Sequence, residues 1–132
     1  MNTKLKGEIS EAKILARLLE KGEQVAIPFG DSQRYDLVVI EGERAVRVQC
    51  KTGWVKDGRI LFKVVSHNPF SYENKGYAND VDVFMVYCFE LNKVYLIQAS
   101  EVTHYKYCVG LRVDKTKNNQ TLDVRWAKDY EY

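Results

Sequence analysis

Two β-rich runs joined by a very short polar connection place the strongest constraint on how this chain can fold. The runs "YDLVVI" and "AVRVQCK" flank "EGER", and Gly42 in this segment suits the first central position of a type II′ hairpin turn. With that two-residue loop, the numbers of paired residues sum to 85, so Asp36 lies opposite Gln49. Lys51 projects from the same face, because strand side chains alternate. The hairpin is therefore predicted to gather a carboxylate, an amide and an ammonium; a longer loop would shift this pairing.

The remaining segments predict a single domain, residues 1–132, of the α/β (α+β) class, with a mixed β-sheet flanked by helices. A first helix is expected from about Lys4 to Lys21, ending at Gly22, with a core face made of Ile9, Ala12, Leu15, Ala16 and Leu19. Asp-Gly within Lys56–Arg59 predicts a second turn. Further strands are expected at Gln24–Phe29, Ile60–Val65, Val81–Phe89, Val94–Ala99, Cys108–Val113 and Thr121–Trp126, a short helix at Ser100–Tyr107, and loops at Ser66–Asp80 and Asp114–Gln120.

Composition narrows the class of protein without identifying it. A chain of 132 residues with 45% hydrophobic residues can bury a real core. It has no apolar run near the roughly 20 residues that span a bilayer and no signal-peptide pattern, so no membrane partner is expected. Its three cysteines form no CxxC pair, and His67 and His104 are isolated, which favours buried thiols in a reducing intracellular compartment, the cytoplasm or an organelle. The net charge of +2 neither identifies nor excludes a nucleic-acid binder.

The polar residues of the hairpin suit metal-assisted hydrolysis of a phosphodiester. Mg²⁺, or Mn²⁺ in its place, prefers oxygen ligands, which Asp36, the Gln49 side-chain carbonyl and the main-chain carbonyl of Cys50 can supply. Lys51 would hold the attacking water or stabilise the phosphate. The alternative is ordinary: an Asp at a strand start and a Gln-x-Lys on a solvent-exposed strand face also occur without any catalytic role.

The order of these residues resembles the PD-(D/E)XK nuclease superfamily, and most closely the group I intron-encoded homing endonucleases with this fold. The resemblance covers about residues 4–100 and includes "GEISE" in the helix, "RYD" before the hairpin and "QCK" within it. It implies a restriction-endonuclease-like core and a catalytic set of Glu11, Asp36, Gln49 and Lys51. It also implies that Glu11 joins the metal ligands, with Glu8 as second choice. The chain departs from the family pattern at Tyr35, which replaces the proline, and at Gln49, which replaces the second acid.

Basic and aromatic residues outside the hairpin are candidates for contacts with double-stranded DNA. The predicted contacts are Lys56, Arg59, Lys63, His67, Asn68, Tyr72, Lys75 and Tyr77. The alternative is that the first three lie on the solvated face of a hairpin and that the aromatic residues pack under their loop. One small subunit carries one centre, so cutting both strands predicts a homo-oligomer, a dimer or tetramer. The C-terminal "RWAKDYEY" segment either contributes to that interface or frays. Three functions follow as hypotheses: a homing-type endonuclease, a junction-resolving nuclease, and a catalytically silent DNA-binding module.

Overall fold

The computed structural model describes residues 1–68, 73–77, 79–115 and 124–132 of the chain. Its elements, in chain order, are α1 (Thr3–Glu20), β1 (Gln24–Ala26), β2 (Leu37–Glu41), β3 (Arg44–Lys56), β4 (Arg59–Lys63), β5 (Val65–Asn68), β6 (Glu73–Gly76), β7 (Val83–Cys88), β8 (Lys93–Gln98), α2 (Ala99–Val102), β9 (Cys108–Arg112) and the 3₁₀ helix η1 (Ala127–Asp129). Within the described residues, no helix is both long and apolar enough to cross a membrane.

The first helix has the predicted extent but a different buried face. Asn2 caps its start by accepting a hydrogen bond from Leu5 N at 2.8 Å. The residues it buries are Ser10, Ile14 and Leu18, whereas Leu19, expected in the core, is 56% exposed. The predicted face was therefore wrong. A serine can lie on the buried face because its hydroxyl is hydrogen-bonded to Thr52 Oγ1 in β3 at 2.6 Å.

The β2–β3 hairpin has the predicted register. Leu37 pairs with Val48 and Glu41 with Arg44, so the loop is the two residues that follow Glu41. Gly42 has a φ of 63°, as the first central position of a type II′ turn requires. The alternation of side chains along β3 therefore follows the sequence prediction.

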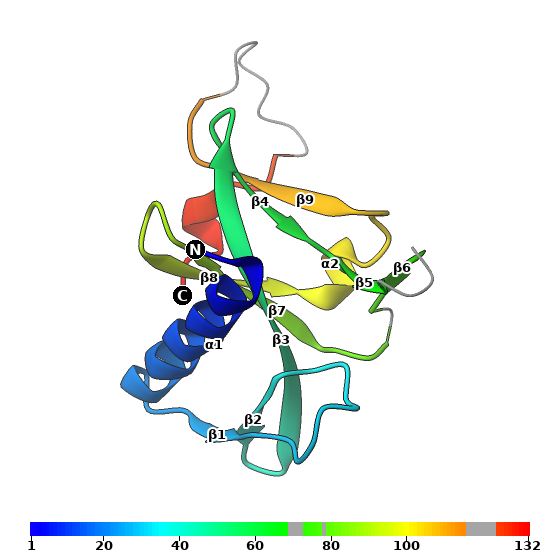
Figure 1. The fold of residues 1–132 in the computed structure, drawn as a ribbon. Helices are drawn as coiled ribbons and strands as arrows, with labels where there is room; N and C mark the ends of the chain where they lie inside the picture. The colour runs from blue at the N-terminus through cyan, green and yellow to red at the C-terminus, as the bar shows by residue number, and fades with distance from the viewer. Residues whose placement is uncertain (69–72, 78, 116–123) are drawn as a thin grey trace.

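The main sheet is mixed, and β3 is its central strand. The path of paired strands is β1-β2-β3-β4-β9, and β7 joins β3 in parallel and β8 in antiparallel orientation. Figure 1 shows β3 running from the β1–β2 end of the molecule to the β4–β9 end. One core cluster lies under α1, with Ile14, Leu18 and Val48, and another involves α2, with Phe62 and Phe84. The mixed sheet between helices confirms the predicted fold class.

Several predicted boundaries differ from the structure. The first strand stops at Ala26, before Pro28, and the second helix is only Ala99–Val102. Part of the expected Ser66–Asp80 loop is instead the β5–β6 hairpin, in which Val65 pairs with Gly76 and Asn68 with Glu73. Of the last expected strand, residues 121–123 lie outside the described residues, and residues 124–126 contribute only an isolated bridge between Trp126 and Arg112.

The C-terminal segment lies along β8. Leu96 N donates to Tyr130 O at 2.8 Å, and Tyr132 N donates to Val94 O at 2.9 Å. Arg17 Nε of α1 donates to Tyr132 O at 2.9 Å. The segment is therefore bound to its own sheet and helix rather than frayed.

Candidate active site

The middle of β3 has one edge that neither antiparallel neighbour covers. Residues 44–48 pair with β2 and residues 54–56 pair with β4, while β7 pairs with residues 48–53 on the other edge. Within the described residues, β2 and β4 therefore leave a gap beside residues 49–53. Main-chain polar groups that face this gap are available to side chains and ligands.

Asp36 lies at the entrance to this gap. Its main-chain N–H donates to Val48 O at 2.8 Å, and its Oδ2 accepts from Cys50 N at 2.9 Å. Burial raises the pKa of the Asp36 carboxyl, while the Cys50 hydrogen bond and the Lys51 charge act in the opposite direction. In an extended strand, the N–H and C=O of one residue face the same edge, so the Cys50 carbonyl also faces the gap.

Gln49 and Lys51 project from the face of β3 that Asp36 approaches. Gln49 Nε2 donates to Cys50 O at a long 3.4 Å, and no described residue donates to the Gln49 side-chain oxygen. Lys51 Nζ donates to Val65 O at 3.1 Å and to Tyr77 Oη at 2.9 Å. Burial lowers the pKa of Lys51 to about 8; Arg34 and Lys63 act in the same direction, and Asp36 opposes them. Lys51 is therefore mostly protonated at neutral pH.

Glu11 reaches this group from α1. Burial raises the pKa of its carboxyl, and the neighbouring carboxylates of Asp36 and Glu8 raise it further. Glu8 is exposed, whereas Glu11 is half-buried next to Ser10, whose hydroxyl is fixed on Thr52. Of the two predicted helix carboxylates, the structure thus brings Glu11 towards Asp36.

The donors around the gap fit a hard divalent cation. Carboxylate oxygens of Asp36 and Glu11, the amide oxygen of Gln49 and the Cys50 carbonyl are all oxygen ligands. The set contains too few acids to form a cluster of three: within the described residues, no three or more His, Cys, Asp or Glu side chains are arranged to hold a metal. Burial raises the pKa of the Cys50 thiol well above its usual value, and the carboxylates of Asp36 and Glu11 add to this effect. The thiol is therefore neutral and is a poor ligand.

The predicted DNA contacts divide into three groups. Lys56 and Arg59 are paired across the β3–β4 turn, and Lys56 projects from the side of β3 opposite to Lys51, because the two positions differ by an odd number. Lys63 and Lys75 are exposed. The side chains of His67 and Asn68, and all of Tyr72, lie outside the described residues.

Tyr77 requires a correction, because it is not available to DNA in this structure. Its side chain is 3% exposed, and its hydroxyl accepts the hydrogen bond from Lys51. Sequence reasoning missed this contact and also missed Arg34, whose guanidinium stacks on the Tyr77 ring at 4.4 Å. The sequence offered only the nearness of Arg34 to Asp36, two residues away, and no local pattern linked Arg34 to Tyr77.

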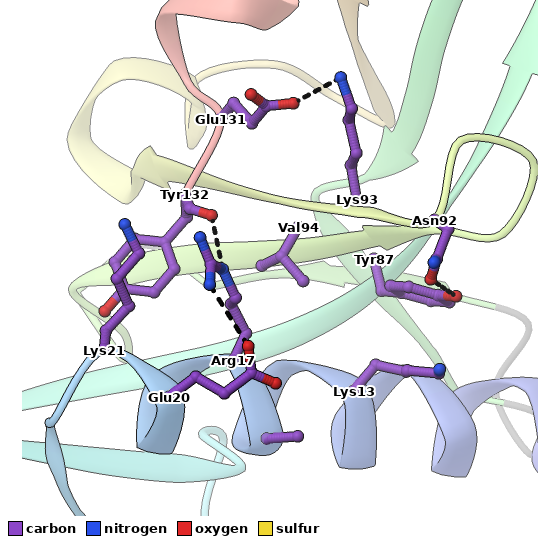
Figure 2. Close-up of a pocket in the computed structure, with 11 residues that line it drawn as sticks. Lys13, Arg17, Glu20, Lys21, Tyr87, Asn92, Lys93, Val94, Glu131 and Tyr132 are labelled. Carbon is purple, nitrogen blue, oxygen red and sulfur yellow. Dashed lines mark hydrogen bonds and ion pairs between the residues drawn. The ribbon is translucent and has the colours of Figure 1, made fainter.

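A separate groove lies between α1, β8 and the C-terminal segment (Figure 2). It has a volume of about 570 Å³ and is lined mainly by charged and aromatic residues. Both of its carboxylates are paired: Glu20 with Arg17 at 3.4 Å and Glu131 with Lys93 at 2.8 Å. It therefore lacks the free acids that the gap in the sheet provides.

Comparison with known proteins identifies the class. The family model described as PD-(D/E)XK endonuclease matches residues 1–132, so the chain belongs to this family of nucleases. Among solved structures, the chain is similar to a bacterial homing endonuclease, I-Ssp6803I, with a TM-score of 0.79 and 26% sequence identity over 99% of this chain and 89% of that one. No curated protein matches the sequence. Members of such a nuclease family act on DNA and generally use divalent metals.

Proposed function

We propose that this protein is a site-specific double-stranded DNA endonuclease of the homing type that depends on Mg²⁺ or Mn²⁺. The observation that carries this proposal is the meeting of Asp36, Gln49 and Lys51 beside the uncovered edge of β3, with Glu11 approaching from α1. The similarity to a solved homing endonuclease over almost the whole chain supports the homing type.

Each residue has a distinct role in this proposal. Asp36, Gln49, the Cys50 carbonyl and Glu11 would hold the metal ion, which, when bound, acidifies a water and neutralises charge on the phosphate. Lys51, protonated at neutral pH, would donate to an oxygen of the scissile phosphate. In this reaction the water would lose a proton to solvent as its oxygen bonds to phosphorus, and the leaving sugar oxygen would take up a proton from solvent as its bond to phosphorus breaks. Lys51 would stabilise the negative charge that develops on the phosphate oxygens in the transition state.

The same proposal includes the oligomeric state of the enzyme and the cellular compartment in which it works. One centre cuts one strand, so a double-strand cut requires a homo-oligomer, a dimer or a tetramer. Free Cys50, Cys88 and Cys108 are consistent with work in a reducing intracellular compartment.

The deciding experiment is incubation with a randomised duplex library and Mg²⁺, followed by sequencing of the cut ends. A defined long target cut by the wild type, and not cut by Asp36→Asn or Lys51→Ala, is the expected result. Lys13→Ala is a matched control that removes a lysine at the groove of Figure 2 and should cut normally.

Two other outcomes identify the competing functions. Cleavage of four-way junctions regardless of sequence would identify a junction-resolving nuclease. Binding of DNA that is unaffected by either substitution, without any cleavage, would identify a silent module.

A further inference from the structure

The Lys51 ammonium is held by the segment that contains the β5–β6 hairpin. In the described part of the chain, Nζ donates to the Val65 carbonyl at 3.1 Å and to the Tyr77 hydroxyl at 2.9 Å. An ammonium has three donors, so these bonds use two and leave one for the site. Val65 begins β5 and Tyr77 follows β6, so both partners come from the same local unit.

The Tyr77 ring is fixed on two sides by packing. It lies edge-on to Phe84 of β7, with ring centroids 5.4 Å apart and an interplanar angle of 82°. The Arg34 guanidinium carbon lies 4.4 Å from the ring centroid. With the ring held in this way and 3% exposed, the hydroxyl has little freedom to move relative to Lys51.

Arg34 links the Tyr77 ring to both strands of the β5–β6 hairpin. Its Nη2 donates to Ser66 Oγ at 3.1 Å and to Gly76 O at 3.1 Å, and its Nη1 lies 3.6 Å from Asp80 Oδ2. Arg34 is also two residues before Asp36. One side chain therefore connects the segment that carries the proposed metal ligand to the segment that orients Lys51.

We propose that Tyr77 is a positioning residue for the cleavage reaction: its hydroxyl, together with the Val65 carbonyl, orients the Lys51 ammonium, and Arg34 holds Tyr77 in place. This inference rests on the proposed function, since it assigns the residue that orients Lys51, the lysine of the proposed site. In this proposal, Val65 and Tyr77, at the two ends of the β5–β6 hairpin, both take part in positioning Lys51.

The test is Tyr77→Phe, which removes the hydroxyl but keeps the ring and its contacts with Phe84 and Arg34. The substrate is the duplex recovered from the library experiment above. Under single-turnover conditions, we expect cleavage to slow by about 10- to 100-fold, as for a small misplacement of a catalytic group, with unchanged affinity for the duplex in Ca²⁺. Tyr87→Phe is the matched control. Tyr87 is also buried and bonded, to Asn92 Oδ1 at 2.7 Å, but it lines the groove of Figure 2, so this variant should cleave at the wild-type rate.

A second readout does not depend on cleavage. In ¹⁵N NMR spectra, the Lys51 ammonium should give a slowly exchanging signal, assigned by its loss in Lys51→Ala, because two hydrogen bonds protect it. Tyr77→Phe should weaken or abolish this signal, and Tyr87→Phe should not. If Tyr77→Phe fails to fold, Arg34→Lys tests the same arrangement, because a lysine keeps the charge but lacks the planar guanidinium that lies over the Tyr77 ring. This variant should also slow cleavage and weaken the signal.

The outcomes separate the two proposals. Wild-type cleavage and an unchanged Lys51 signal in folded Tyr77→Phe would overturn the positioning role and leave the nuclease proposal standing. Absence of cleavage by the wild type on every duplex would overturn the proposed function, whereas the NMR comparison would still report whether Tyr77 fixes Lys51.

Discussion

Replacing Gly53 with alanine tests how tightly β3 is packed next to the gap between β2 and β4. Gly53 is buried in β3, two residues after Lys51 and on the same face. A Cβ built at this position would lie 2.8 Å from Val86 Cγ1 and 2.9 Å from Ile60 Cγ2. Both are closer than real carbon contacts allow, so at least one neighbour has to move.

The cost follows from the stiffness of those neighbours. Val86 and Ile60 are 0% exposed and β-branched, so neither can swing its methyl group away easily. Overpacking of this kind lowers the free energy of unfolding by about 1–3 kcal/mol. Alanine has less backbone freedom than glycine in the unfolded chain, and this difference offsets about 0.5–1 kcal/mol of the loss. We expect a net loss of about 1–2 kcal/mol, which lowers the Tm of a domain of this size by about 4–8 °C.

Thermal unfolding followed by circular dichroism measures this loss. The control is Gly7→Ala in α1, where an added Cβ meets nothing within 4 Å. Because alanine is the better helix former, this control should raise stability by about 0.5–1 kcal/mol. A Tm for Gly53→Ala equal to or above that of the wild type would refute the close packing of β3 against β4 and β7.

Three further substitutions test other features of the site and the fold. Ser10→Ala removes a buried hydrogen bond to Thr52 and should cost about 1–2 kcal/mol in urea unfolding, with part of the loss recovered by adding Thr52→Val; an unchanged midpoint contradicts this. Gln49→Glu adds a charged oxygen ligand and should keep cleavage while lowering the Mg²⁺ concentration needed; a folded but inactive variant would argue against Gln49 as a ligand. Hydrogen bonding from Arg47 lowers the pKa of Asp82, so its stabilisation is present above the unfolded pKa of about 4 and disappears as pH falls. Asp82→Asn should therefore destabilise the protein more at pH 7 than at pH 3, and an equal loss at both would contradict the ion pair.

The hairpin and its polar cluster were predictable because local chemistry determines them. Gly42 sets the turn, the turn sets the register, and the register places Asp36 beside Gln49 and Lys51. The buried strand β7 was equally visible, since all six of its residues are buried and apolar. Its parallel pairing with β3 was not visible, because no local pattern specifies a partner more than 30 residues away.

The errors arise where distant contacts overrule local preference. The buried face of α1 was predicted wrongly because serine is a polar residue that usually faces solvent. Ser10 is buried here because its hydroxyl is hydrogen-bonded to Thr52, which the sequence does not indicate. The β5–β6 strands are polar and resemble a loop in sequence, yet Arg34 bonds their main chain at Lys75 and Gly76. Tyr77 was assigned to DNA because its hydroxyl partner, Lys51, lies 26 residues away.

We expect the C-terminal segment to affect how this protein behaves at high concentration. Without residues 130–132, the outer main-chain groups of Val94 and Leu96 in β8 would face solvent, where they could pair with the same strand of a second molecule. The last residues thus act as a cover against intermolecular sheet growth. Shortening the chain there should produce concentration-dependent aggregation before any loss of the remaining fold.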